Sequence, residues 1–102
     1  MRVALCTCPP NESERIARAL VEAGAACVNI LPGVKSVYVW KGAVCEDAEA
    51  LLVVKFALEK AEVVRARMQA THPYELPEWV VLAPDELLTS EKYRAWVRGE
   101  AS

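Results

Sequence analysis

The stretch AACVNILPGVKSVYVWKGAVCEDAEALLVVKFA, residues 25–57, decides the fold. It contains two runs rich in apolar and β-branched residues, which predict one strand over 25–40 and another over 43–57. Pro32-Gly33 interrupts the first run, and a turn or bulge is expected there. Lys41-Gly42 separates the two runs and predicts a tight hairpin turn.

The segments on either side of this hairpin alternate between strand and helix patterns. Asn11 and Glu14 stand at the spacing of a capping box, and Gly24 is a typical helix-ending residue. His72 precedes a proline and therefore ends a helix. The elements expected around the hairpin are a strand over 2–8, a helix from Asn11 to Gly24, a helix over 59–71, a strand over 79–83 and a short helix from Ser90 or Glu91.

The order of these elements is strand–helix–strand–strand–helix–strand, followed by a C-terminal helix. This order predicts an α+β fold of the ferredoxin-like βαββαβ type with an antiparallel sheet. The 102 residues contain no linker, low-complexity tract or internal repeat. We therefore expect a single domain over residues 1–102.

Two of the predicted strands are bulky on both faces, namely at Val37–Trp40 and at Leu51–Val54. Two helices cover only one face of an antiparallel sheet, and the other face is usually polar. The apolar character of both faces predicts that a second copy of the chain, or another partner, covers the face without helices.

The composition excludes several classes of partner. Lys and Arg number 12 against 14 Asp and Glu, the net charge is −2, and there is no basic block, so no nucleic-acid partner is expected. No apolar run approaches the roughly 20 residues that span a bilayer, so no membrane partner is expected. The opening MRVALCTCPP does not resemble a signal peptide, which predicts a cytoplasmic protein with reduced thiols.

The single histidine and one cysteine are candidate metal ligands. His72 lies in the stiff segment HPYELP, and its ring suits either local packing in a turn or a role as ligand or proton carrier. Cys6 suits either a small core position or a thiolate ligand, and Cys8 shares its strand face. A thiolate with an imidazole fits a soft or borderline metal such as copper or zinc. One chain offers few ligands, so such a site would be open or shared between subunits.

The aromatic residues near His72 leave two interpretations open. Tyr38, Trp40 and Tyr74 are expected either in the core or an interface, or as walls of a pocket beside His72. The chain has neither a Gly-x-Ser-x-Gly setting nor a Gly-rich phosphate loop, so we expect no enzyme.

An acidic patch follows the hairpin turn. Glu46, Asp47 and Glu49 are expected to form a solvated sheet edge that guards against strand pairing. A hard-cation site there is the alternative, but the patch lacks the ligand count of a calcium site. Asn29, in an otherwise apolar strand, must find partners for its amide if it is buried.

Three segments carry a more specific signal: AACVNILPG at 25–33 with Ser36, Tyr38, Trp40 and Gly42; Glu46-Asp47-x-Glu49 before LLVVK; and His72-Pro73-Tyr74-Glu75-x-Pro77-Glu78 with Tyr93-x-x-Trp96. In order and spacing these segments resemble the CutA divalent-cation tolerance family. Cys6-Thr7-x-Pro9 fits the resemblance as well. The likeness extends over nearly the whole chain.

The resemblance implies a ferredoxin-like subunit in a homotrimer, and a cytoplasmic protein linked to tolerance of copper and other divalent cations. It implies Cys6 and His72 as metal ligands, with copper or another divalent cation as a possible cofactor. A family member with a His-His-Pro-Tyr loop offers two histidines, whereas this chain has Thr71 before His72.

The resemblance also implies a cleft between subunits at Cys27, Trp40, His72 and Tyr74. A second hypothesis follows from analogy with PII-like signalling trimers, in which a small ligand would bind in that cleft. A third hypothesis is a scaffold whose assembly is its function.

Overall fold

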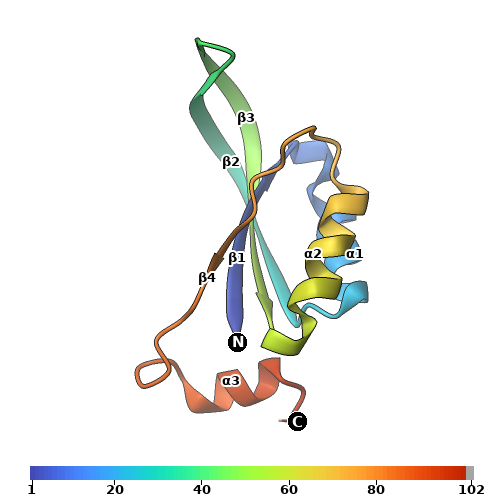
Figure 1. The fold of residues 1–102 in the computed structure, drawn as a ribbon, viewed down its shortest axis with the longest axis vertical. Coiled ribbons are helices and arrows are strands. Elements are labelled where there is room, and N and C mark those ends of the chain that lie inside the picture. The colour runs from blue at the N-terminus through green and yellow to red at the C-terminus, as the bar shows by residue number, and fades with distance from the viewer. Residues whose placement is uncertain (101–102) are drawn as a thin grey trace.

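The computed structural model describes residues 1–100; the last two residues of the predicted domain 1–102 lie outside the described part. Four strands form one sheet in the order β2-β3-β1-β4, with every neighbouring pair antiparallel. Helices α1 and α2 lie side by side against one face of this sheet (Figure 1). The fold is the predicted ferredoxin-like α+β fold. The elements are β1 (Arg2–Cys8), η1 (Pro10–Glu12), α1 (Ser13–Ala23), β2 (Cys27–Trp40), β3 (Ala43–Phe56), η2 (Leu58–Lys60), α2 (Ala61–Thr71), β4 (Val80–Leu82) and α3 (Glu91–Val97).

The start of the first helix differs from the sequence prediction. Helix α1 begins at Ser13 after a 3-10 turn, and no side-chain hydrogen bond caps it, so the capping box predicted for Asn11 and Glu14 is wrong. Pro10 explains the difference because its fixed φ favours the first position of the 3-10 turn. The Ser13 hydroxyl then donates to the Pro10 carbonyl at 2.9 Å.

The hydrophobic core lies between the sheet and the two helices. Alternate residues of β1 and β3 point toward the helices, as the period of a strand requires. Burial of each large apolar side chain contributes about 1.5–3 kcal/mol to stability. Cys6 and Cys8 belong to this layer. The largest side chains that are fully buried in it are Phe56, Ile16, Leu20, Leu52 and Val54.

The β2–β3 hairpin extends beyond the rest of the domain (Figure 1). A register shift between Leu31 and Val34 marks the predicted bulge, and Gly33 supplies a φ of 75° there. At the tip, Lys41 and Gly42 have φ values of 51° and 81°. Positive φ at both central residues is typical of a type I′ turn, which confirms the predicted tight hairpin.

The sheet face away from the helices is apolar. Leu5 pairs with Val53 on one side and with Val80 on the other, so these three side chains form one row across that face. Val80 is half exposed in the single chain. On the hairpin, Val39 and Val44 pair with each other on the opposite face, the one that Leu52 and Val54 share, and are 69% and 75% exposed. Self-association through these surfaces stays a prediction.

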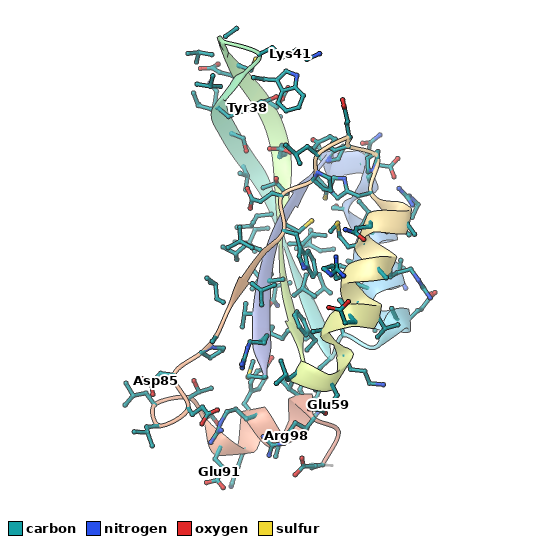
Figure 2. The ribbon with its side chains drawn as sticks, viewed as in Figure 1. Tyr38, Lys41, Glu59, Asp85, Glu91 and Arg98 are labelled. Atoms are coloured by element: carbon teal, nitrogen blue, oxygen red, sulfur yellow. The ribbon has the colours of Figure 1, made fainter. Side chains whose placement is uncertain are left out.

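The hairpin makes the chain elongated. Its radius of gyration is 14.5 Å, whereas a compact domain of 100 residues has about 13 Å. Figure 2 shows Tyr38 and Lys41 near the free end of the hairpin, and Asp85, Glu91 and Arg98 at the opposite end of the molecule. No helix in residues 1–100 is both long and apolar enough to cross a membrane.

The bulge gives a test of backbone strain. Gly33→Ala should lower the free energy of unfolding by about 1–2 kcal/mol, because the left-handed region disfavours a Cβ atom. No atom lies within 4 Å of the added Cβ, so the cost arises from the backbone alone. Urea unfolding at fixed protein concentration measures it, with Gly33→Asn as the control that tolerates positive φ. A Gly33→Ala variant as stable as the parent chain would contradict the assigned bulge.

Candidate functional site

A cavity of about 710 Å³ lies between the β2–β3 hairpin and the segment that follows α2. The hairpin supplies one wall and the proline-bounded segment supplies the other. The side chains that line the cavity are Thr7, Ser36, Val37, Tyr38, Val39, Trp40, Asp47, Glu49, Pro73, Tyr74, Glu75, Leu76 and Glu78.

The bulge determines which residues of β2 share a sheet face with Asp47 and Glu49. Beyond the shift, Ser36 pairs with Asp47, and Lys35 is turned to the other face of the hairpin. There Lys35 makes a salt bridge to Glu46 at 3.4 Å. In an unshifted register Lys35 would stand opposite Asp47, because Leu31 pairs with Leu51 before the bulge. The bulge therefore places Lys35 on the hairpin face opposite to that of Asp47 and Glu49.

Glu49 is the buried charge of the site. It stands on β3 beside Ala50, the last β3 residue that pairs with β1, and its side chain is only 7% exposed. Its Oε2 accepts a hydrogen bond from the Tyr74 hydroxyl at 2.7 Å. Within residues 1–100 its Oε1 accepts no hydrogen bond and no salt bridge reaches it, but Oε1 is not among the buried atoms left without a partner and so stays open to the cavity. Buried carboxylates are normally paired with a cation or bound to a metal.

The cavity lining is strongly acidic. It includes the carboxylates of Asp47, Glu49, Glu75 and Glu78, and none of its residues is Lys, Arg or His. The Tyr38 hydroxyl donates to Asp47, and this hydrogen bond raises the pKa of Tyr38 to about 12. The site therefore favours positive ligands and disfavours nucleotides and other anions.

His72 is held by hydrogen bonds at both ring nitrogens. Pro73 favours the extended conformation of His72, which has a ψ of 134° at the end of α2. Nε2 lies 2.8 Å from the Thr7 carbonyl oxygen, so Nε2 carries the hydrogen and donates it. Nδ1 accepts the Tyr74 backbone N–H at 3.1 Å, and the two rings are 4.8 Å apart. Neither nitrogen has a lone pair free for a metal.

Cys6 is completely buried. Burial raises the pKa of its thiol to about 12, and neighbouring negative charges, first that of Cys8, add to the effect. A thiolate at this position is therefore disfavoured. With the two nitrogens of His72 engaged, the Cys6 and His72 side chains as arranged do not fit a copper site. Their role as metal ligands stays a prediction.

The residues predicted for an inter-subunit cleft fall in two places. Trp40 and Tyr74 line the cavity, whereas Cys27 lies at the far end of β2. There Tyr93 is its neighbour, and burial first and the Cys27 thiol second raise the pKa of Tyr93. Thirteen steps of strand separate Cys27 from Trp40, or about 40 Å. A cleft that holds both must take them from different chains.

The burial of Glu49 is the feature that differs most from expectation. Glu46 and Asp47 are exposed, as predicted for a solvated edge, but Glu49 is not. Tyr74 covers it from the segment after α2. Tyr38, Trp40 and Tyr74 all line the cavity, which agrees with the second of the two interpretations of these residues, and their part in an inter-subunit cleft stays a prediction. Asn29, the other polar residue singled out, accepts a hydrogen bond from Lys55.

Fold and site together define a ferredoxin-like protein with an acidic, aromatic-walled cavity at a long hairpin. The family model of the CutA1 divalent ion tolerance protein matches residues 2–100. Divalent-cation tolerance protein CutA of Thermus thermophilus is 46% identical over 98 residues, which are 94% of this chain and 93% of that protein.

Solved structures agree with this assignment. PII-like protein CutA from Nostoc sp. PCC 7120, solved in apo form, has a TM-score of 0.91 and 43% identity over 100% of this chain and 98% of its own. The Thermus thermophilus protein has a TM-score of 0.89 and covers 100% of both chains. The chain belongs to the CutA1 divalent ion tolerance protein family.

Because the Cys6 thiol is buried, we expect the free energy of unfolding to fall at alkaline pH. Cys6 has a higher pKa in the folded state than in the unfolded chain, so its contribution is complete below about pH 8.5 and is lost as pH rises toward 12. The free energy of unfolding should fall more steeply over this range in the parent chain than in Cys6→Ala. Urea unfolding from pH 8 to 11 tests this, and parallel curves would exclude the effect.

Proposed function

We propose that this protein is a homotrimeric, non-enzymatic cytoplasmic protein that binds divalent cations at the acidic cavity. The observation that carries the proposal is Glu49, a carboxylate that is 7% exposed and has no cationic partner within residues 1–100. The Thermus thermophilus relative and the family are both named for tolerance of divalent cations or ions, and these names support a divalent cation as the ligand.

The donor atoms indicate which cations fit. Carboxylate and phenol oxygens suit hard cations such as Mg²⁺ and Mn²⁺ better than copper. No three His, Cys, Asp or Glu side chains in the described part of the chain are grouped closely enough to hold an ion. A cation in this cavity therefore keeps several waters, as Mg²⁺ commonly does, or takes ligands from a second chain.

The cavity also distinguishes this proposal from the PII-like alternative. A nucleotide or organic anion requires Lys, Arg or a backbone cradle, and the lining has four carboxylates and no basic side chain. We propose binding and not catalysis because neither Cys6 nor His72 is activated as a nucleophile or base. Burial disfavours the Cys6 thiolate, and both ring nitrogens of His72 make hydrogen bonds.

Replacement of Glu49 tests the cation site. Glu49→Gln should weaken binding of Mn²⁺ about tenfold or more, because it removes the buried charge and nearly preserves the shape. Titration calorimetry with Mn²⁺ and Cu²⁺ measures the affinities. Glu86→Gln, an exposed residue on the 83–90 loop, is the matched control.

The same titration separates the rival assignments. The thiol–imidazole site would be favoured if Cys6→Ser and His72→Ala each abolish Cu²⁺ binding while Glu49→Gln binds Cu²⁺ with the affinity of the parent chain. A parent chain that binds no divalent cation but shows a raised melting temperature with nucleotides would favour the PII-like alternative.

The homotrimer rests on the apolar surfaces of the single chain and on the family resemblance in the sequence. Val39→Asp should dissociate the assembly, because it places a charge on an apolar hairpin surface that is 69% exposed in one chain. Light scattering should give three times the 11.2 kDa chain mass for the parent protein and the chain mass for the variant. Val63→Asp, on the exposed side of α2, is the control and should stay trimeric. An unassembled parent chain at micromolar concentration would overturn the proposal.

A further inference from the structure

We infer that His72 is a positioning residue that holds Tyr74 over Glu49, and that it does not ligate the cation. The inference deepens the proposed function, since it specifies which groups of the site meet the ligand. It begins from the contacts of one ring, which joins the end of α2, the end of β1 and the wall of the cavity.

The first contact fixes the segment after α2 to the sheet. The hydrogen bond from Nε2 of His72 to the Thr7 carbonyl connects residues 65 positions apart in the chain. Thr7 is near the end of β1, where it pairs with Leu51 on β3. The ring therefore anchors the loop at the point where the hairpin leaves the four-stranded sheet, one residue pair away from Ala50 and close to Glu49.

The second contact orients Tyr74. The Tyr74 N–H donates to Nδ1 of His72 at 3.1 Å, and the two rings pack at a centroid distance of 4.8 Å with an interplanar angle of 53°. With its backbone and its ring both held, the Tyr74 hydroxyl reaches Oε2 of Glu49 at 2.7 Å. The chain of contacts runs from Thr7 through His72 and Tyr74 to Glu49.

This arrangement leaves the imidazole without a ligand role. The Thr7 carbonyl only accepts, and the Tyr74 N–H only donates, so together they select the Nε2–H tautomer and occupy both nitrogens. His72 does not line the cavity, whereas Tyr74 and Glu49 do. Its effect on a cation is exerted through Tyr74, in the way that outer residues orient the ligands of metal sites.

Nitrogen-15 spectroscopy of the ring provides the direct test, since His72 is the only histidine. The metal-free protein should show the Nε2–H tautomer at neutral pH, and Zn²⁺ should leave both ring nitrogens without the shift of direct coordination. A coordination shift at either nitrogen, or the Nδ1–H tautomer, would overturn the inference. The tautomer is measured without any cation, so this result does not depend on the proposed function.

Two conservative variants separate the two hydrogen bonds. His72→Asn can still accept the Tyr74 N–H, as in an Asx turn, whereas His72→Gln places an amide donor nearer the Thr7 carbonyl. Hydrogen exchange of the Tyr74 amide should stay slow in His72→Asn and become fast in His72→Ala and His72→Gln. Equal exchange in all three variants would show that the ring does not hold Tyr74.

Cation affinity completes the test. His72→Ala should weaken Mn²⁺ binding about tenfold, which is typical for loss of a residue that orients ligands, and His72→Asn should recover part of the loss. Tyr74→Phe should reproduce the weakening in the presence of an intact His72. If Tyr74→Phe binds Mn²⁺ with full affinity while His72→Ala binds it more weakly, His72 does not act through Tyr74, and the inference is overturned. If the parent chain binds no Mn²⁺, the proposed function fails, and the tautomer and exchange results still decide the role of His72.

Discussion

The register shift between Leu31 and Val34 is the constraint on which the site depends. A strand has a period of two, so one extra residue exchanges the side chains of the two faces for the remainder of β2. Here the exchange places Ser36, Tyr38 and Trp40 on the face of Asp47 and Glu49 and sends Lys35 to the other face. Without it, Lys35 would stand opposite Asp47, on the face that carries the carboxylates.

Glu49 is the residue of this cavity whose carboxylate is least exposed to water. A carboxylate withdrawn from water is costly unless hydrogen bonds or a positive charge compensate. Tyr74 supplies one hydrogen bond, and the same interaction, after burial, raises the pKa of Tyr74. A phenol that stays protonated remains a donor to Glu49 over the whole physiological range. The other carboxylate oxygen is not among the buried atoms of residues 1–100 left without a partner, so it is open to water or to a ligand.

The fold was predictable from local patterns, and the site was predictable only in part. Strand periods, the Pro32-Gly33 interruption and the Lys41-Gly42 turn act over a few residues, so the sequence displays them directly. The sequence offered a pocket lined by Tyr38, Trp40 and Tyr74 only as one of two interpretations, since aromatic residues on a strand equally fit a core or an interface. The burial of Glu49 could not, because Tyr74 covers it from 25 positions away, and an acidic run beside a turn is typical of a solvated edge. The engagement of His72 Nε2 depends in the same way on the Thr7 carbonyl 65 positions away, whereas the partner of Nδ1 is the Tyr74 N–H only two positions away.

The proposed assembly and the proposed cation site share the hairpin, so a coupling between them is expected. The cavity is lined by Tyr38, Val39 and Trp40, and the adjoining surface includes exposed Val39 and Val44, which a second copy would cover. Any cation that binds the assembled state more tightly than the free chain must stabilise the assembly by the same free energy, since linkage is reciprocal. The separation of Cys27 and Trp40 leads to the same view, because only different chains can bring these residues together. If the proposed assembly forms, the hairpin is the element through which a bound cation would affect the neighbouring copies.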